Sequence, residues 1–414
     1  MNNYNPNSLR ILADGVFTSN NTRKTGLNNN DLIIGGSGSG KTGGYVVPNL
    51  ENLSGSMVVI DTKHALERTM RAKLERKGFE VHVLDFVDSL ESEGYNPLRN
   101  VRWNSHTDSF SDLDISTIAH AIAPQDVGNS DPFWNRAAEQ WVEAVIALTL
   151  EAVDDHEVTM LDVLDMSDYL QSKDGQAWLN EWRDHFPESV GARRVLAALQ
   201  SAPAEKTWQS VMMIAKDMLH PFSLSERHAL LGENGTIDLG ALGERPSVLF
   251  VNVSDSDRSA NALLNVFYIQ LFHELIRKAD ASKNGRLRVP VRIILDDFAA
   301  SARIDDFDKI ISVIRSREIS VSVVLQSLSQ LQAAYGPAKA NTIINNCDHI
   351  IYLGGNDLET ATYLSARMDW TRQHVLELPR TDALVLEAGA RGKQVAKVPP
   401  YSKVRMNPEW VPAL

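Results

Sequence analysis

The sequence predicts an α/β protein with a mainly parallel sheet, into which an all-α domain is inserted. Two observations lead to this prediction. Short runs rich in Val, Ile and Leu alternate with helix-length segments, which is typical of a parallel sheet covered on both faces. The stretch from about Asp112 to Leu231 has almost no such runs and carries helical patterns instead. We therefore expect residues 1–111 and 232–414 to form the α/β domain and residues 112–231 the all-α domain.

Seven apolar runs are the expected strands of the sheet. They are Leu32–Gly36, Ser56–Ile60, Phe79–Leu84, Ser247–Val253, Val291–Leu295, Ser320–Leu325 and His349–Leu353. Between two of them, Ala260–Ala279 has apolar residues at helical spacing, and Ser259 can cap its start.

The predicted all-α domain is also rich in tryptophan. Helical patterns cover Ala137–Ala152 and Val190–Gln200. Five of the eight tryptophans of the chain fall in this part: Trp134, Trp141, Trp178, Trp182 and Trp208. A buried helical core explains them best, because aromatic side chains supply a large buried area. Platforms on which nucleic-acid bases stack are the alternative.

Composition narrows the class of protein. A length of 414 residues favours two domains, and 43% hydrophobic with 23% charged residues is ordinary for a globular protein. The single cysteine, Cys347, excludes an internal disulfide framework and a thiolate zinc cluster. No secretory signal opens the chain, and no apolar run is long enough to cross a bilayer. These features indicate a reduced, intracellular enzyme. The net charge of −12 argues against an all-round basic surface but leaves room for a local basic channel.

A phosphate-binding loop follows the first predicted strand. Gly35-x-x-x-x-Gly40-Lys41-Thr42 matches the P-loop pattern, so we expect ATP and Mg²⁺ as ligands. The expected nucleotide-binding residues are Gly35, Gly36, Ser37, Gly38, Ser39, Gly40, Lys41 and Thr42. Lys41 would neutralise the β- and γ-phosphates, and the Thr42 hydroxyl would coordinate Mg²⁺. Pro48 should bend or end the helix that follows.

A pair of acidic residues ends the strand Val291–Leu295. This arrangement has the form of a Walker B strand, in which Asp296 holds the metal shell and Asp297 polarises the attacking water. An acidic strand end that simply faces solvent is the alternative. Most hydrolytic proteins of this mechanistic class carry Glu where Asp297 stands. Because Asp is one methylene shorter, we expect slow turnover.

Polar residues flank the next strand, Ser320–Leu325. Gln326 follows it and is a candidate reader of the γ-phosphate. Arg315 and Arg317 precede it, a suitable place for an arginine finger that serves the next subunit of a ring. A surface salt bridge is an equally good reading of either arginine. The basic stretch Lys278–Arg288 is a candidate nucleic-acid contact, with a solvated loop as the alternative.

Many further motifs occur in the order found in one family. They are Arg23–Leu27, Gly44–Leu50, Ile60–Lys63, Tyr95–Leu98, Asp131–Trp134, Leu295–Ala299, Arg315–Arg317, Gln326–Leu331, Tyr335–Gly336, Asn345 with Asp348, Leu353–Gly354 and Thr360–Ala361. Together with the P-loop, this series resembles the type IV secretion coupling proteins, the TraG-like conjugal transfer ATPases. The Gly44–Leu50 motif also accounts for Pro48.

The resemblance implies a RecA-like P-loop ATPase domain that carries an all-α domain and assembles as a hexameric ring when active, with a monomer as the alternative for the isolated chain. It implies that Lys41 and Thr42 form the Walker A pair, Asp296 is the Walker B acid, Arg315 is the arginine finger and Gln326 is the sensor. It further implies that residues 112–231 recognise the cargo, which is a relaxase on single-stranded DNA or a secreted effector protein. The cargo is then delivered to the channel components of a type IV secretion system.

The sequence departs from the family pattern at three points. Members usually begin with two transmembrane helices, which are absent here, so we expect a truncated or naturally soluble form, cytoplasmic and held at the inner face of the membrane by partners. Asp297 replaces Glu. The Asp-x-Lys-Gly-Glu motif reads Asp61-Thr-Lys63-His64-Ala65.

Two other functions are alternatives for this sequence, and the second is disfavoured. These departures keep open a nucleotide-gated adaptor that binds relaxase or effector with little ATP turnover. A generic ring helicase or chromosome-pumping ATPase is disfavoured by the Asp131–Trp134 motif and the helical insertion.

Overall fold

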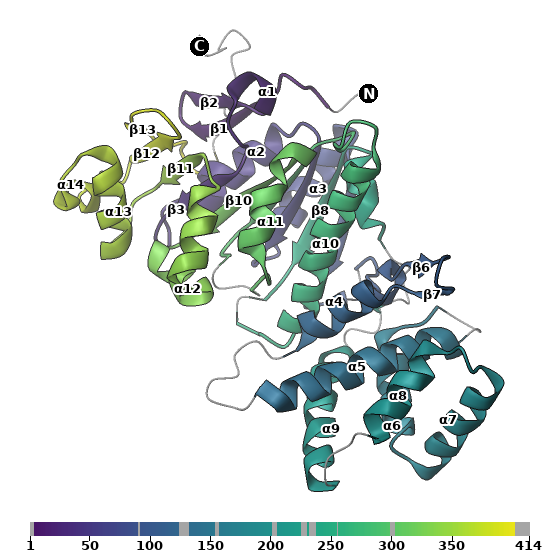
Figure 1. Cartoon of the computed structure of the whole chain (residues 1–414). Coiled ribbons are helices and arrows are strands. Elements are labelled where there is room, and N and C mark those ends of the chain that lie inside the picture. Colours follow the sequence, from purple (N-terminus) through teal and green to yellow (C-terminus); the bar gives the residue numbers. More distant parts are fainter. Residues whose placement is uncertain are drawn as a thin grey trace. The chain divides into compact units, whose positions relative to one another are not determined.

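The computed structural model of the chain describes residues 4–89, 92–123, 132–153, 157–200, 205–224, 230–231, 237–254, 256–298 and 303–401. The chain divides into two compact units (Figure 1). One consists of Met1–Val83, Asp238–Ser256 and Leu271–Leu414. The other consists of Leu84–Ile237 and Asp257–Gln270.

A nine-stranded sheet with the order β13-β12-β11-β3-β10-β9-β4-β8-β5 forms the first unit's frame. Its strands are β3 (Asp31–Ile34), β4 (Ser56–Asp61), β5 (Glu80–Asp85), β8 (Ser247–Asn252), β9 (Val291–Leu295), β10 (Ile319–Leu325), β11 (His349–Tyr352), β12 (Asp382–Glu387) and β13 (Lys393–Ala396). The pairings from β11 through β3, β10, β9 and β4 to β8 are parallel. All seven predicted strands are therefore confirmed, and the prediction of a mainly parallel sheet holds.

The antiparallel edge of this sheet was not predicted from the sequence. β12 pairs with β11 and β13 pairs with β12, both antiparallel. β13 is mostly exposed and carries the polar residues Lys393 and Gln394, so it lacks the apolar run by which the other strands were recognised. Two small hairpins were also missed: β1 (Leu9–Ala13) with β2 (Val16–Ser19), and β6 (Trp103–Asn104) with β7 (Ser109–Phe110).

Helices cover both faces of the sheet (Figure 1). α2 (Val47–Glu51) and α3 (Ala65–Arg76) lie on one face, and α11 (Phe307–Val313) and α12 (Leu328–Asn345) lie on the other. The remaining helices of this unit are α1 (Thr22–Thr25), α13 (Leu358–Met368) and α14 (Arg372–Leu376), and α10 (Asn261–Ala281) is divided between the two units. In one apolar core cluster, alternate strand residues pack with residues of α2, α3 and the turn before α2. Its members include Ile33, Met57, Val59, Val248, Phe250, Ile294, Val46, Leu50, Leu66, Met70 and Leu74.

The second unit is mainly helical. Its helices include α4 (Asp112–Ile122), α5 (Pro132–Ala152), α6 (Met160–Tyr169), α7 (Lys173–His185), α8 (Val190–Gln200) and α9 (Glu205–Leu219). α8 packs directly on α5. The two helices are so close that a Cβ at Gly191 would come within 2.3 Å of the Leu148 backbone nitrogen. Trp141 is fully buried and donates its ring N–H to the Ser167 hydroxyl at 2.9 Å. For Trp141, the predicted role as a core residue is thus confirmed.

The helical unit is larger than the predicted insertion. It starts at Leu84 rather than Asp112, and it also takes in Asp257–Gln270, the part of the chain that contains the first half of α10. The boundaries of a cargo-recognition domain at residues 112–231 remain a prediction. In the described part of the chain, none of the helices combines the length and apolar character that a bilayer span requires.

Candidate nucleotide-binding site

The predicted P-loop connects the central strand β3 to a helix. All four residues of β3 are buried, and the loop leaves its end at Gly35. Gly38 and Gly40 have φ angles of 72° and 95°, in the left-handed region that favours glycine. A Cβ at Gly35 would lie 2.4 Å from the Ser39 Oγ and 3.0 Å from the Leu353 Cβ, so a larger residue here would displace the Ser39 hydroxyl. The loop can therefore curl tightly enough for backbone N–H groups to point inward at a phosphate.

The two neighbouring strands fix the start of this loop. The Gly35 N–H donates to the Leu325 carbonyl at the end of β10, at 3.0 Å. On the other side, the Gly36 N–H donates at 2.9 Å to the carbonyl of Gly354, which follows β11. The loop is thus held in one position at the carboxyl edge of the sheet.

Two side chains of the loop suit a phosphate ligand. The Ser39 Oγ is buried and has no hydrogen-bond partner in the structure. The Lys41 ammonium lies across the loop and donates to the Gly35 carbonyl at 2.7 Å and the Gly36 carbonyl at 3.3 Å. Partial burial lowers the pKa of Lys41, although the Asp297 and Asp296 carboxylates oppose this shift. An anion placed in the loop would relieve the unpartnered hydroxyl and attract the ammonium.

Asp296 lies directly opposite the end of the P-loop. The Thr42 hydroxyl donates to its Oδ2 at 3.0 Å. Burial raises the pKa of Asp296, and the neighbouring Asp297 carboxylate raises it further, against the Thr42 hydrogen bond. A hydroxyl beside a carboxylate is the donor set that P-loop proteins use for Mg²⁺, so the residues present fit this ion.

Asp297 follows in an uncommon backbone conformation. Its φ is 47°, and its N–H donates to the Asp296 Oδ1 at 3.0 Å. A left-handed conformation at a non-glycine residue costs free energy and is frequent at functional sites. The Asp297 side chain is half-buried, at the same sheet edge as the P-loop.

The segment after the P-loop departs from a regular helix. Thr42–Val46 forms a π-helical turn, in which the Val47 N–H donates to the Thr42 carbonyl, and α2 then ends at Glu51. The prediction that Pro48 bends or ends the helix describes this only in part. Pro48 lies near the start of α2, where a missing N–H is tolerated, and the irregular turn comes before it.

Gln326 and Arg315 lie at opposite ends of β10. β10 pairs with β9, the strand before Asp296, as predicted, and Leu325 also pairs with Ile34, so Gln326 follows β10 beside the start of the P-loop. The role of Gln326 as a reader of the γ-phosphate stays a prediction. Arg315 belongs to the short 3₁₀ turn before β10, and its guanidinium donates to the Gly26 carbonyl. Arg315 is exposed and is not brought together with the other predicted catalytic residues of the same chain.

The neighbouring basic residues are mostly paired. Arg317 makes two hydrogen bonds to Asp280, at 2.7 and 3.0 Å, which confirms the salt-bridge reading for this arginine. In the basic stretch, Lys278 pairs with Glu244 at 2.7 Å and Arg286 pairs with Glu318. Lys283 and Arg288 are exposed.

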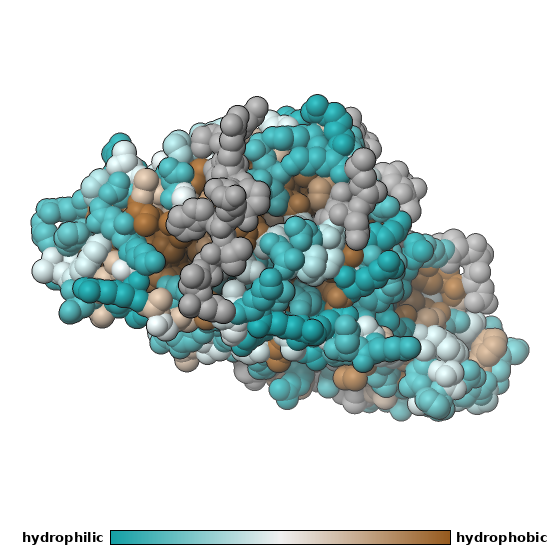
Figure 2. Space-filling view, turned by 90° about the horizontal axis from the view of Figure 1, so that it is seen from above, coloured by the Kyte–Doolittle hydropathy of each residue, from teal (hydrophilic) through white to brown (hydrophobic). Residues whose placement is uncertain are grey.

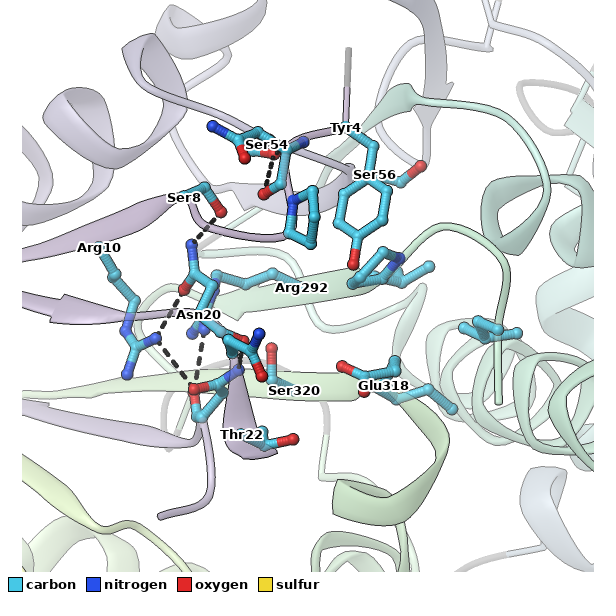
Figure 3. A pocket seen from close by; sticks show the side chains of 18 of the residues that line it. Tyr4, Ser8, Arg10, Asn20, Thr22, Ser54, Ser56, Arg292, Glu318 and Ser320 are labelled. Atoms are coloured by element: carbon cyan, nitrogen blue, oxygen red, sulfur yellow. Dashed lines mark hydrogen bonds between the residues drawn. The ribbon is translucent and has the colours of Figure 1, made fainter. Parts of the chain in front are cut away.

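A cavity of about 530 Å³ lies at the amino ends of β4, β9 and β10, on the edge opposite to the P-loop (Figure 3). Its charged lining residues are Arg10, Arg23, Arg286, Arg288, Arg292, Arg315 and Glu318. Figure 3 shows Arg10 hydrogen-bonded to Asn20, with Arg292 and Glu318 on other walls. Hydrophilic residues dominate the face of the molecule seen in Figure 2.

A buried charged cluster at the amino end of β3 was not predicted from the sequence. Asp31, the first residue of β3, forms ion pairs with Arg10 at 2.6 Å, Arg292 at 3.4 Å and His349 at 3.3 Å. Tyr45, in the turn after the P-loop, donates its hydroxyl to the same carboxylate. Burial would raise the pKa of Asp31, but Arg10, His349 and Arg292 together hold it well below its usual range. The available signal was an arginine inside an apolar run, which is Arg10 in Leu9–Ala13 and Arg292 in Val291–Leu295.

The altered motif after β4 has a structural role. The Asp61 carboxylate accepts from the Lys63 N–H at 3.1 Å and from the Leu66 N–H at 2.7 Å. The Asp61 carboxylate thereby satisfies a backbone N–H in the first turn of α3. His64, at the N-cap position of α3, has a left-handed conformation with a φ of 52°.

Comparison with known proteins identifies the family. The sequence profile described as "Type IV secretory system Conjugative DNA transfer" matches residues 7–375. The "Probable conjugal transfer protein TraG" of Sinorhizobium fredii is 23% identical over 389 residues. The alignment covers 91% of this chain and 58% of that relative, so the chain spans a little under three fifths of its length.

Solved structures show the same fold. The plasmid coupling protein TrwB in complex with ADP and Mg²⁺ has a TM-score of 0.63 at 18% identity, covering 91% of this chain and 87% of that one. TrwB in complex with the ATP analogue ADPNP has a TM-score of 0.65 at 16% identity, covering 96% and 92%. The fold is therefore the RecA-like P-loop fold. With the profile match across most of its length, the chain belongs to the type IV secretory system conjugative DNA transfer family.

Proposed function

We propose that this chain binds ATP with Mg²⁺ and hydrolyses it to deliver relaxase-bound single-stranded DNA, or an effector protein, to a type IV secretion channel during conjugation. The hydrogen bond between Thr42 and Asp296 carries the proposal, because it joins the P-loop to the Walker B strand. TrwB, which shares this fold, has been solved with ADP and Mg²⁺ and with an ATP analogue. When bound here, Mg²⁺ would neutralise charge that develops on the phosphates.

Each residue of the site has a proposed part in the reaction. The loop residues that follow Gly36 hold the phosphates through backbone N–H groups, and Ser39 adds its unpartnered hydroxyl. Gly35 and Gly36 position the loop through their N–H bonds to Leu325 and Gly354. Lys41 turns from the loop carbonyls to the phosphates. Thr42 and Asp296 hold the metal, Asp297 orients and deprotonates the attacking water, and Gln326 reads the γ-phosphate from the end of β10.

Arg315 must act on a different subunit. Seven residues of β10 separate its turn from the P-loop edge, which is a span of roughly 23 Å at 3.3 Å per residue. One arginine side chain does not bridge this distance. We therefore propose that Arg315 is a finger for the neighbouring subunit of a ring, and that the active form is a homo-hexamer. The neighbour's phosphates would approach the arginine-lined edge of the sheet.

ATP turnover with and without single-stranded DNA tests the motor function. Lys41→Ala should abolish turnover, whereas Lys309→Ala, which alters an exposed surface lysine, should leave it unchanged. Single-stranded DNA should raise turnover in the wild type, and the stimulation should weaken with salt. Absence of stimulation over a range of salt concentrations would contradict a DNA motor.

Asp297 supports a second candidate function, a nucleotide-gated adaptor that hydrolyses little ATP. The side chain is shorter than glutamate and starts from a left-handed residue. Asp297→Glu should raise turnover if the missing methylene is what limits it. Relaxase retention that survives Lys41→Ala, together with negligible wild-type turnover, would favour the adaptor.

Partners are proposed to hold the protein at the inner face of the membrane.

The helical segment 112–231 is the proposed cargo-recognition domain. Met213 on α9 is 70% exposed and is a suitable probe of the surface of this segment. Met213→Asp should weaken retention of relaxase by the full chain and leave ATP affinity unchanged. Equal retention by the wild type and the variant would exclude the α9 surface as a cargo contact.

A further inference from the structure

The segment Lys397–Tyr401 crosses the start of the helix after the P-loop. The Tyr401 N–H donates to the Gly43 carbonyl at 2.9 Å. At the other end, the Lys397 ammonium donates at 2.7 Å to the carbonyl of Leu353, which follows β11. Val398 between them is buried. The segment is therefore fixed on the nucleotide-binding site by bonds at both ends.

The close approach explains two glycines that the P-loop pattern does not require. A Cβ at Gly43 would lie 2.9 Å from the Pro400 Cβ and 3.0 Å from the Tyr401 Cε2. A Cβ at Gly44 would lie 2.9 Å from the Val398 carbonyl oxygen. Pro400 also lies 3.2 Å from the position of a Cβ on Gly40. The sequence thus keeps this face of the loop free of side chains where the segment passes.

The sheet order decides which end of a nucleotide the segment meets. β10 and β9, which carry Gln326 and Asp296 at their ends, lie on one side of β3. β11, whose following residue Leu353 holds Lys397, lies on the other side. A triphosphate that presents its γ-phosphate to Asp296 must direct its nucleoside end away from β9. The nucleoside end therefore faces the segment that ends in Tyr401.

Tyr401 has the exposure and conformation of a ligand-contacting residue. Tyr401 is 73% exposed, and its ring lies beside Gly43, where an added Cβ would come 3.0 Å from the Tyr401 Cε2, so the ring is accessible next to the loop. Its φ is 60°, a left-handed conformation that costs free energy in tyrosine and is concentrated at binding sites. We infer that Tyr401 stacks on the base of the nucleotide held by the P-loop. This inference rests on the proposed nucleotide binding and extends it to the base.

Stacking has a recognisable consequence for specificity. Every nucleobase has a π face, so an aromatic platform tolerates different bases and contributes affinity without reading hydrogen-bonding groups. A phosphate chain without a base gains nothing from the platform. ATP and inorganic tripolyphosphate, which share the contacts to the P-loop, therefore separate the role of Tyr401 from that of the loop.

The experiment measures the affinity of the full chain for both ligands in the presence of Mg²⁺ by calorimetry. Tyr401→Ala should weaken ATP binding about tenfold, within the range measured for loss of a base-stacking aromatic. Tyr401→Phe should retain wild-type affinity because it keeps the ring. Tripolyphosphate should bind equally to the wild type and both variants. Tyr169→Ala, at an exposed tyrosine of α6 in the helical unit, is the matched control.

Two results would overturn the inference. Equal loss of ATP and tripolyphosphate affinity in Tyr401→Ala would mean that the variant only disturbs the loop. Unchanged ATP affinity in that variant would mean that the base does not contact Tyr401. If the wild type bound neither ligand, the proposed nucleotide binding itself would fail, and that outcome is distinct from the other two.

Discussion

The Thr42 hydroxyl donates a hydrogen bond to the Asp296 carboxylate at 3.0 Å, across 254 residues of sequence. β3 and β9 are not neighbours in the sheet, since β10 lies between them. The contact therefore depends on the order of three parallel strands. It gives the site a preformed pair of oxygen donors, and several predictions depend on this arrangement.

Thr42→Ala should remove the Mg²⁺-dependent part of nucleotide affinity. The variant loses a metal ligand and also leaves the buried Asp296 without its hydroxyl donor, at a cost of about 1–3 kcal/mol. ATP affinity measured with Mg²⁺ should fall to the level measured with chelator, whereas Thr42→Ser should bind as the wild type does. A Thr42→Ala variant that still binds more tightly with Mg²⁺ would show that Thr42 is not a ligand.

Asp31→Asn should be strongly destabilising although Asp31 lies outside the phosphate loop. The fully buried carboxylate is paired with Arg10, and removal of one partner from a buried ion pair costs about 3–5 kcal/mol. Chemical denaturation should show this loss in the free energy of unfolding. Asp14→Asn, at an exposed residue in the turn between β1, which carries Arg10, and β2, should change the free energy of unfolding by less than about 0.5 kcal/mol. Similar stability of both variants would mean that the cluster does not hold the fold together.

His349 should make stability fall as the pH rises. Burial alone would lower the pKa of His349, but the Asp31 and Glu387 carboxylates, 3.3 and 3.6 Å from its ring nitrogens, raise it above the ordinary value of 6.5. A group with a raised pKa in the folded state stabilises fully below its unfolded pKa, and this contribution is lost as the pH passes through the folded value. Unfolding measured at about pH 6 and about pH 9 should show a decrease in the wild type that is smaller in His349→Gln. An equal decrease in both proteins would remove His349 as the cause.

The sequence was sufficient where one local pattern determines one local structure. The P-loop and the strand before Asp296 follow from short motifs, and the strands of the parallel sheet follow from apolar runs that are buried on both faces. The Asp31 cluster did not follow, because its members come from three strands of the large sheet, a separate hairpin and a turn, and meet only in the folded chain. Tyr401 was missed for the same reason. Nothing in the sequence near it indicates that the chain returns to Gly43.

Arg315 and Lys41 should complement each other when they are altered in different subunits. The two residues lie at opposite edges of the sheet, so each active site of a ring would combine the P-loop of one subunit with the arginine of the next. Arg315→Ala and Lys41→Ala should each abolish turnover alone. In an equal mixture, about a quarter of the interfaces would pair an intact P-loop with an intact arginine, so turnover should reappear at roughly that fraction. If Arg315 acted within its own subunit, mixing would restore nothing. Arg317→Ala, which breaks the ion pair to Asp280 in the same turn, should keep turnover and serves as the control.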